Sequence, residues 1–169
     1  MKPRIYLEKL LAQDFENFYT LTGNEKVMAM ITERALSKEE ALKKFNYFLQ
    51  NNELHKSFGS FKVLEVGSSK LLGFAKLEIK NENRNEAELG YMLLPEFWGR
   101  GLGDEIAKHL LEVAKSDPDL KRVYAITDPD NIASRKILLN NGFTSEEVGE
   151  IDGLASEVFG RTVNLDSLD

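Results

Sequence analysis

Hydrophobic and polar positions follow two different periods along the chain. A short strand is expected at Arg4–Leu10. After it, apolar residues recur every three or four positions, which predicts helices at Asp14–Leu21, from Asn24 through Ile31, and after Ser37. Ser37 and Glu40 have the spacing of a capping box. The first third of the chain is therefore expected to be mainly helical.

From Ser57 the pattern changes to that of strands. Gly67-Ser68-Ser69 reads as the turn of an antiparallel hairpin, and the polar run Asn81 to Asn85 reads as a loop. A nearly continuous apolar run follows, typical of a strand covered on both faces. The strands predicted here are Ser57–Val66, Leu71–Lys80 and Ala87–Leu94.

The second half of the chain alternates helices with strands. Leu102, Ile106 and Leu110 share one face of a helix, in which Asp104 and Lys108 can pair. A strand at Arg122–Thr127, a helix beginning at Asn131, and a left-handed cap at Gly142 follow; the final hairpin is predicted at Thr144–Ile151 and Leu154–Val163. This order predicts one mixed α/β domain over residues 1–169.

Composition and charge narrow the function classes. The net charge of -6 and the pI near 5.1 argue against a nucleic-acid binder, since phosphate contacts need clustered Lys and Arg. No apolar run approaches the roughly 20 residues of a membrane span, so no membrane association is expected. The chain has no cysteine, which excludes disulfides. We expect a cytoplasmic protein without a metal site.

A glycine-rich segment joins the predicted strand at Ala87–Leu94 to the next helix. In Gly99-Arg100-Gly101-Leu102-Gly103, exposed backbone N–H groups and the helix dipole favour an anion such as a pyrophosphate. The same glycines would also serve a simple tight turn. A P-loop is excluded because no Gly-Lys-Ser/Thr follows, and the dinucleotide fingerprint lacks its last glycine.

Two blocks of sequence resemble the GCN5-related N-acetyltransferases, in particular the RimJ/RimL-like branch that acetylates the N-termini of ribosomal proteins. The first block runs from Glu88 to Gly103 and includes Pro-Glu-Phe-Trp-Gly-Arg-Gly-Leu-Gly. The second is Asn131-Ile-Ala-Ser-Arg-Lys-Ile-Leu-Leu-Asn-Asn-Gly-Phe143. The order of elements outside the blocks is also similar, so the resemblance covers nearly the whole chain.

The resemblance implies a single GNAT-like domain with a mostly antiparallel mixed sheet, a splayed central strand pair and flanking helices. It also implies acetyl-CoA as co-substrate, with the pantetheine in the gap between the splayed strands. Trp98 stands where the wider family has Gln or Arg, and Asp104 places a carboxylate beside the proposed pyrophosphate unless it pairs with Lys108. The residues that the resemblance assigns to the cofactor are Met92, Leu93, Leu94, Arg100, Gly101, Leu102, Gly103, Asp104, Asn131 and Ser134.

Glu88 is the candidate general base. Acetyl transfer to an amine needs a neutral amine, and Glu88 is an ionisable group in a buried-type strand beside the gap. The alternative is a strand glutamate without a catalytic role. The resemblance further suggests that the N–H of Met92 or Leu93 polarises the thioester carbonyl.

Ser134 is the candidate donor of a proton to the departing thiolate. Many relatives use a tyrosine at the position that Leu138 occupies here, whereas the RimJ/RimL-like branch has a serine matched by Ser134. Asn131 and Ser134 can equally form an ordinary helix N-cap. His55 and His109 suggest no metal site, and Tyr91 reads as a core or gap-lining aromatic.

The sequence therefore predicts an acetyl-CoA-dependent N-acetyltransferase that transfers the acetyl group directly to a primary amine of a small molecule or a protein N-terminus. The alternative is a non-catalytic CoA-binding sensor or interaction module of the same fold. Polyamines, amino acids, aminoglycosides and protein N-termini all remain open as acceptors, and the protein is expected as a monomer or homodimer.

Overall fold

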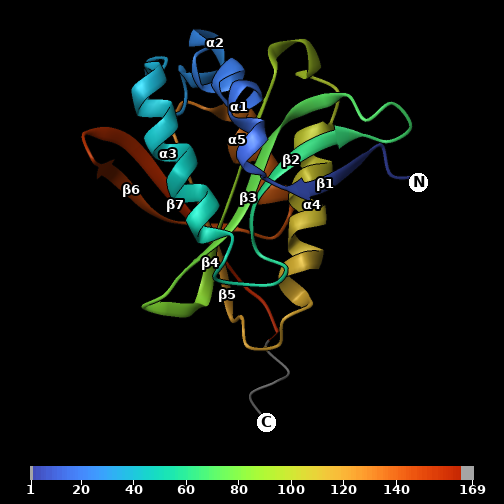
Figure 1. The fold of residues 1–169 in the computed structure, drawn as a ribbon. Coiled ribbons are helices and arrows are strands. Elements are labelled where there is room, and N and C mark those ends of the chain that lie inside the picture. The colour runs from blue at the N-terminus through green and yellow to red at the C-terminus, as the bar shows by residue number, and fades with distance from the viewer. Residues whose placement is uncertain (1, 165–169) are drawn as a thin grey trace.

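A seven-stranded sheet forms the centre of the protein (Figure 1). The structure is a computed structural model that describes residues 2–164. The strands lie in the order β1-β2-β3-β4-β5-β7-β6. Their bounds are β1 Ile5–Lys9, β2 Gly59–Glu65, β3 Leu71–Lys80, β4 Asn83–Leu93, β5 Arg122–Thr127, β6 Thr144–Ile151 and β7 Leu154–Thr162. The helices are α1 Phe15–Thr22, α2 Glu25–Met28, α3 Lys38–Asn51, α4 Leu102–Lys115 and α5 Ile132–Asn140, with short 3-10 turns at Ala12–Asp14 and Pro95–Phe97.

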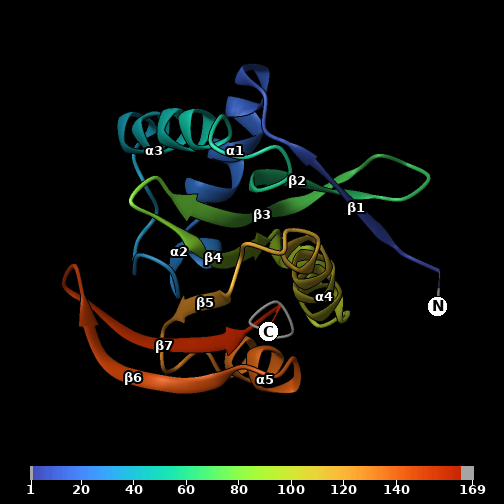
Figure 2. The same ribbon diagram turned by 90° about the horizontal axis from the view of Figure 1, so that it is seen from below.

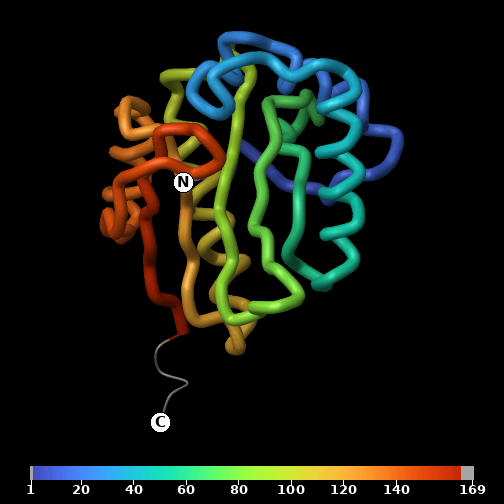
Figure 3. Tube along the Cα trace, turned by 90° about the vertical axis from the view of Figure 1, so that its left-hand side faces the viewer, coloured from blue at the N-terminus to red at the C-terminus, as the bar shows by residue number. Residues whose placement is uncertain are grey.

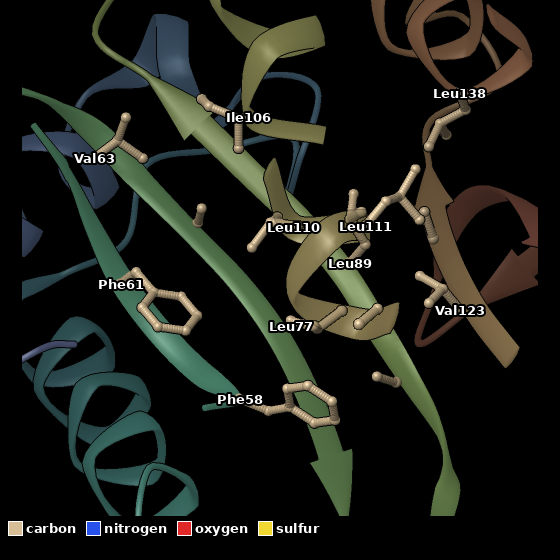
Figure 4. Packing of buried hydrophobic residues seen from close by; sticks show 14 of the residues in the cluster. Phe58, Phe61, Val63, Leu77, Leu89, Ile106, Leu110, Leu111, Val123 and Leu138 are labelled. Atoms are coloured by element: carbon tan, nitrogen blue, oxygen red, sulfur yellow. The ribbon is translucent and has the colours of Figure 1, made fainter. Parts of the chain in front are cut away.

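Helices cover both faces of the sheet (Figure 2). On one side α1 and α3 enclose an aromatic cluster that includes Phe18, Phe45 and Phe74. On the other side α4 places its apolar stripe, with Ile106 and Leu110, against the sheet (Figure 4). Two buried layers therefore hold the sheet, as expected for a mixed α/β protein.

Neighbouring strands are antiparallel with one exception, the parallel pair β4 and β5. This confirms the mostly antiparallel mixed sheet. The parallel pair is short, because its register covers Glu86↔Arg122, Ala87↔Val123 and Glu88↔Tyr124 and no further residue.

Beyond Glu88 the two strands separate. β4 continues to Leu93 beside β3 alone, and β5 continues to Thr127 beside β7 alone. In Figure 3 the turn between β6 and β7 lies beside this upper part of β4. The splayed central pair is confirmed, and one edge of β4 carries no strand partner after residue 88.

Several boundaries differ from the sequence prediction. β4 begins at Asn83, so the loop expected at 81–85 is wrong for its second half, because Asn83 pairs with Lys80 in a tight hairpin. The side chains of β4 enter both clusters, because Leu89 belongs to the core on the α4 side and Met92 packs against the cluster of α1 and α3, with only partial burial at residues 90–92. α2 ends at Met28, three residues before Ile31.

The caps read from the sequence are confirmed. Ser37 and Glu40 form the capping box of α3. Gly142 has a φ of 84°, and the N–H of Phe143 donates to the Leu138 carbonyl at 3.1 Å. No helix within residues 2–164 combines the length and the hydropathy that a membrane span requires.

His55 joins β2 to the end of α4. Its Nδ1 accepts hydrogen bonds from the backbone N–H groups of Ser57 and Phe58 at 2.9 and 3.0 Å, so Nε2 carries the proton donated to Asp117 Oδ2 at 2.7 Å. The ring stacks on Phe58 with centroids 3.8 Å apart. Hydrogen bonds from His55 and from the N–H of Asp119 lower the pKa of Asp117.

This contact predicts an acid-sensitive contribution to stability. Because the pKa of Asp117 is lower in the folded than in the unfolded protein, its contribution is present at about pH 7 and is lost as the pH falls below about 4. Asp117→Ala should reduce the free energy of unfolding by about 1–2 kcal/mol at neutral pH. Urea titrations should show this deficit shrinking with falling pH, whereas the control Asp119→Ala should show little deficit at either pH.

Candidate active site

A cavity of about 310 Å³ opens where β4 and β5 separate. Its wall includes residues of β3, β4, β5, α3, α5 and the β6–β7 turn. Four of the catalytic and cofactor candidates from the sequence line it, namely Glu88, Met92, Asn131 and Ser134, and so does Tyr91. The remaining candidates, Leu93, Leu94 and the run 100–104, lie outside its wall.

Glu88 lies on β4 at the last paired position before the splay. Its carboxylate forms an ion pair with Lys76 Nζ at 3.0 Å, and both side chains line the cavity. Lys76 also contacts Glu78 Oε2 at 3.4 Å. Burial favours the neutral form of Lys76, but the charges of Glu88 and Glu78 outweigh it and raise the pKa of Lys76, which therefore remains a cation.

Glu78 connects this pair to helix α3. It is 5% exposed, and its Oε1 accepts a hydrogen bond from the Tyr47 hydroxyl at 2.5 Å. This bond raises the pKa of Tyr47, so the phenol stays protonated and acts as the donor. Tyr47, Glu78, Lys76 and Glu88 thus form a chain of contacts that fixes the carboxylate of Glu88 at the cavity wall.

The backbone N–H and C=O groups of successive β4 residues point toward opposite neighbours in the sheet. The N–H of Leu94 donates to the Leu72 carbonyl of β3 at 2.9 Å. Because hydrogen-bonding directions alternate in an antiparallel ladder, the backbone groups of Met92 also point to β3, and those of Leu93 point to the gap. The Leu93 carbonyl accepts from Trp98 Nε1 at 2.9 Å, whereas the N–H groups of Leu93 and Tyr91 point toward the gap as donors.

The glycine-rich segment forms the N-terminus of α4. Gly101 is the N-cap residue and has a φ of 76°, a left-handed conformation that disfavours other residues. Arg4 braces the segment, because its Nη1 donates to the Arg100 carbonyl at 2.8 Å and its Nε pairs with Glu105 at 2.8 Å. The Arg100 guanidinium lies over the Phe97 ring. The amides of Leu102, Gly103 and Asp104 belong to the first helical turn, which has no intrahelical acceptors.

The Asp104 carboxylate has two side-chain partners at the N-terminus of α4. Its carboxylate pairs with Lys108, the i,i+4 partner expected from the sequence, and accepts a hydrogen bond from Asn141 Nδ2 at 2.8 Å. The bond from Lys108 lowers the pKa of Asp104 despite partial burial. The partners hold the carboxylate against α5 and balance its charge.

Asn131 and Ser134 form the N-cap of α5. The N–H of Ser134 donates to Asn131 Oδ1 at 3.2 Å, which confirms the capping interpretation. The Ser134 hydroxyl also lies 3.4 Å from the Tyr91 hydroxyl. Burial raises the pKa of Tyr91, so its phenol is protonated. The structure thus places a second hydroxyl beside Ser134.

Titratable groups in the described part of the chain form no cluster suited to a metal ion. His55 contacts Asp117 instead, and His109 is exposed on α4. The polar side chains that line the cavity include the carboxylate of Glu88, the ammonium groups of Lys44 and Lys76, and the hydroxyls of Tyr91 and Ser134.

Residues 4–144 match the acetyltransferase (GNAT) domain family. The chain belongs to the GNAT family. The expectation of an N-acetyltransferase enzyme is confirmed by this match. A curated relative from Bacillus subtilis strain 168, named uncharacterized N-acetyltransferase YoaA, is 25% identical over 146 residues that cover 86% of this chain and 82% of the relative.

Solved structures share the GNAT fold with this chain. The spermidine N-acetyltransferase of Vibrio cholerae, in complex with CoA and spermine, has a TM-score of 0.78 at 20% identity and covers 98% of this chain and 99% of its own. RimL, a ribosomal L7/L12 alpha-N-protein acetyltransferase in complex with CoA, has a TM-score of 0.77 at 18% identity, with 96% of each chain covered.

Sequence reasoning missed two members of this GNAT site and one contact within it. Lys76 was hidden because its contact with Glu88 depends on strand register. Tyr91 lines the cavity, in agreement with its reading as a core or gap-lining aromatic, but its contact with the Ser134 hydroxyl was missed because it forms only when α5 packs against β4. Lys44 of α3 lines the same cavity, and its helical position gave no sign of this.

Proposed function

We propose that this GNAT protein binds acetyl-CoA in the gap beyond Glu88 and transfers the acetyl group directly to a primary amine. The observation that carries the proposal is the cavity at the splay, whose wall holds a carboxylate, Glu88, and two adjacent hydroxyls, Ser134 and Tyr91. A base for the amine and a proton source for the leaving thiolate are the two groups that this reaction needs.

The backbone around the gap fits the donor. A pantetheine has amide groups along its length, and the free edge of β4 offers it the N–H of Leu93. A pyrophosphate suits the first-turn amides at Leu102, Gly103 and Asp104, with Arg100 beside them. The pairing of Asp104 with Lys108 and Asn141 removes the main objection to an anion there.

Each residue then has a defined task. Acetyl-CoA supplies a thioester whose C–S bond breaks as the bond between the amine nitrogen and the acetyl carbon forms. The Glu88 carboxylate takes the proton that the amine loses, directly or through water. The Leu93 N–H stabilises the negative charge that develops on the acetyl oxygen. The Ser134 hydroxyl, with Tyr91 beside it, donates a proton to the sulfur; Ser134 then regains a proton from water, and Glu88 releases to water the one that it took from the amine.

A turnover assay tests the proposal. Acetyl-CoA incubated with the protein and a panel of primary amines should release free thiol faster than it does without protein. CoA binding in calorimetry, combined with no thiol release for any amine, would instead favour the non-catalytic sensor.

Glu88→Gln tests the base. The substitution keeps the shape of the side chain and removes its basicity, so kcat/KM should fall about 10²-fold or more, and the limb of the pH profile that depends on this group should flatten. Glu78→Gln is the matched control, because it also removes a carboxylate from Lys76 but lies outside the cavity wall. An unchanged profile in Glu88→Gln would remove the role assigned to Glu88.

Gly101→Val tests the anion site. A β-branched residue in the left-handed conformation is strained by roughly 1–3 kcal/mol, so the loop should rearrange and CoA affinity should fall about tenfold or more. Gly67→Val introduces the same kind of strain in the β2–β3 turn, where φ is 95°, far along the chain from the loop. Calorimetry with CoA should show weak binding only for Gly101→Val; equal affinity in both variants would place the pyrophosphate elsewhere.

A further inference from the structure

Lys44 is a cation in the cavity wall that lacks a bonded partner in the structure. It projects from α3, which covers the face of the sheet that carries Glu88. Within residues 2–164 no carboxylate forms an ion pair or hydrogen bond with it. Crowding by protein atoms, followed by the nearby charge of Lys76, lowers the pKa of Lys44. The residue is nonetheless exposed, and an anion bound beside Lys44 would counter the repulsion from Lys76.

Lys76 cannot serve a ligand in the same way. Its ammonium group is already shared between Glu78 and Glu88, at 3.4 and 3.0 Å. Lys44 interacts electrostatically with all three of these groups, which places it near the base. Of the two lysines in the cavity wall, Lys44 is therefore the one whose charge remains for a ligand.

Ser60 adds a second donor. It is 3% exposed and lines the cavity, and its hydroxyl has no hydrogen-bond partner within the described residues. It lies directly across from Lys76 in the β2–β3 register. The hydroxyl oxygen is itself almost fully buried, so a ligand that accepts its hydrogen bond must displace the atoms that cover it, and in return a group that otherwise has no partner gains one.

The rest of this side of the cavity is apolar. Phe48 of α3 and Phe74 of β3 form part of its wall. Met30 and Ile31, in the segment after α2, line it too and are 43% and 41% exposed, so their apolar surface is open to a ligand. A ligand with an apolar body would cover them.

We propose that the acetyl acceptor is a primary amine on an apolar body that also carries a carboxylate, as an apolar amino acid does. This inference rests on the proposed function and names its acceptor class. The amine lies toward Glu88, the carboxylate binds Lys44 with Ser60 as a second donor, and the apolar body packs against Met30, Ile31 and Phe48.

A polyamine is the rival acceptor. Glu33, Asp128 and Asp152 also line the cavity and would attract a second ammonium group. Asp128 is partly satisfied, because it accepts from the N–H of Asp130 at 2.8 Å. Near Glu88, however, the charge of Lys76 is already balanced by Glu78 and Glu88, and a second ammonium there would meet the unpaired charge of Lys44. Lys44 therefore favours an anionic group over a second ammonium at this part of the wall.

The test uses pairs of amines that differ only in the carboxylate. L-Leucine is compared with L-leucinamide, and ε-aminocaproate with hexylamine. The two pairs differ in the distance between the amine and the carboxylate. Spermidine represents the rival polyamine class. Rates of thiol release are compared across a pH range, because an amide neighbour makes an amine less basic. For at least one pair, kcat/KM of the carboxylate should exceed that of its neutral partner about tenfold.

Variants show whether Lys44 causes the preference. Lys44→Met should bring the ratio within a pair close to one, and Lys44→Arg should restore most of it. Lys43→Met, at the neighbouring position of α3 and outside the cavity wall, is the matched control and should keep the wild-type ratio.

The outcomes separate this inference from the proposed function. Thiol release in which neutral amines or spermidine are preferred, or in which Lys44→Met keeps the ratio, would overturn the acceptor class and leave the enzyme assignment standing. If no amine releases thiol, calorimetry is used to measure how tightly the four paired amines bind to the CoA-bound protein. Tighter binding of a carboxylate than of its neutral partner, lost in Lys44→Met, would support the acceptor site without turnover. Equal binding of the two members of each pair would reject it.

Discussion

The parallel pairing of β4 with β5 ends after three residue pairs, and this limit shapes the rest of the site. Each strand has a different partner on its far side, β3 for β4 and β7 for β5, so both continue as ordered strands after they part. A gap between two well-held strands is rigid and leaves backbone groups on the inner edge of β4 without a strand neighbour. The apolar packing of α4 against the sheet and of α1 and α3 on the other face keeps the parted strands in place.

Because side chains alternate along β4, the proposed base and the two hydroxyl groups lie on opposite faces of the sheet. Glu88 points toward Lys76, on the face that α3 covers, whereas Tyr91 points to the face of α4 and α5 and meets Ser134. The cavity at the splay reaches both faces, because no strand closes the sheet there. A base and a pair of hydroxyls can therefore approach one reacting centre from opposite sides of the same sheet.

Local sequence patterns correctly predicted the features that depend on contacts between residues close together in the chain. The capping box at Ser37, the N-cap at Asn131 and the left-handed residue Gly142 depend on contacts within a few positions, and the structure confirms all three. The family resemblance predicted the sheet and its splay. Contacts set by register or by packing between distant elements were out of reach: Lys76 with Glu88, and Tyr91 with Ser134. The extension of β4 to Asn83 was missed because polar residues at a hairpin end resemble a loop.

The position of Lys76 shows how such a distant contact is built into the backbone. Lys76 pairs with Gly90 across β3 and β4, and a Cβ at Gly90 would lie 3.0 Å from Lys76 Cε. A larger residue at this point would make the lysine stem give way by a few tenths of an ångström. The missing side chain lets the stem lie across β4 and brings its ammonium to Glu88, two residues along the same face. The charge beside the proposed base therefore approaches it over a glycine that lies outside the glycine-rich loop, and this position lets Lys76 reach both Glu78 and Glu88.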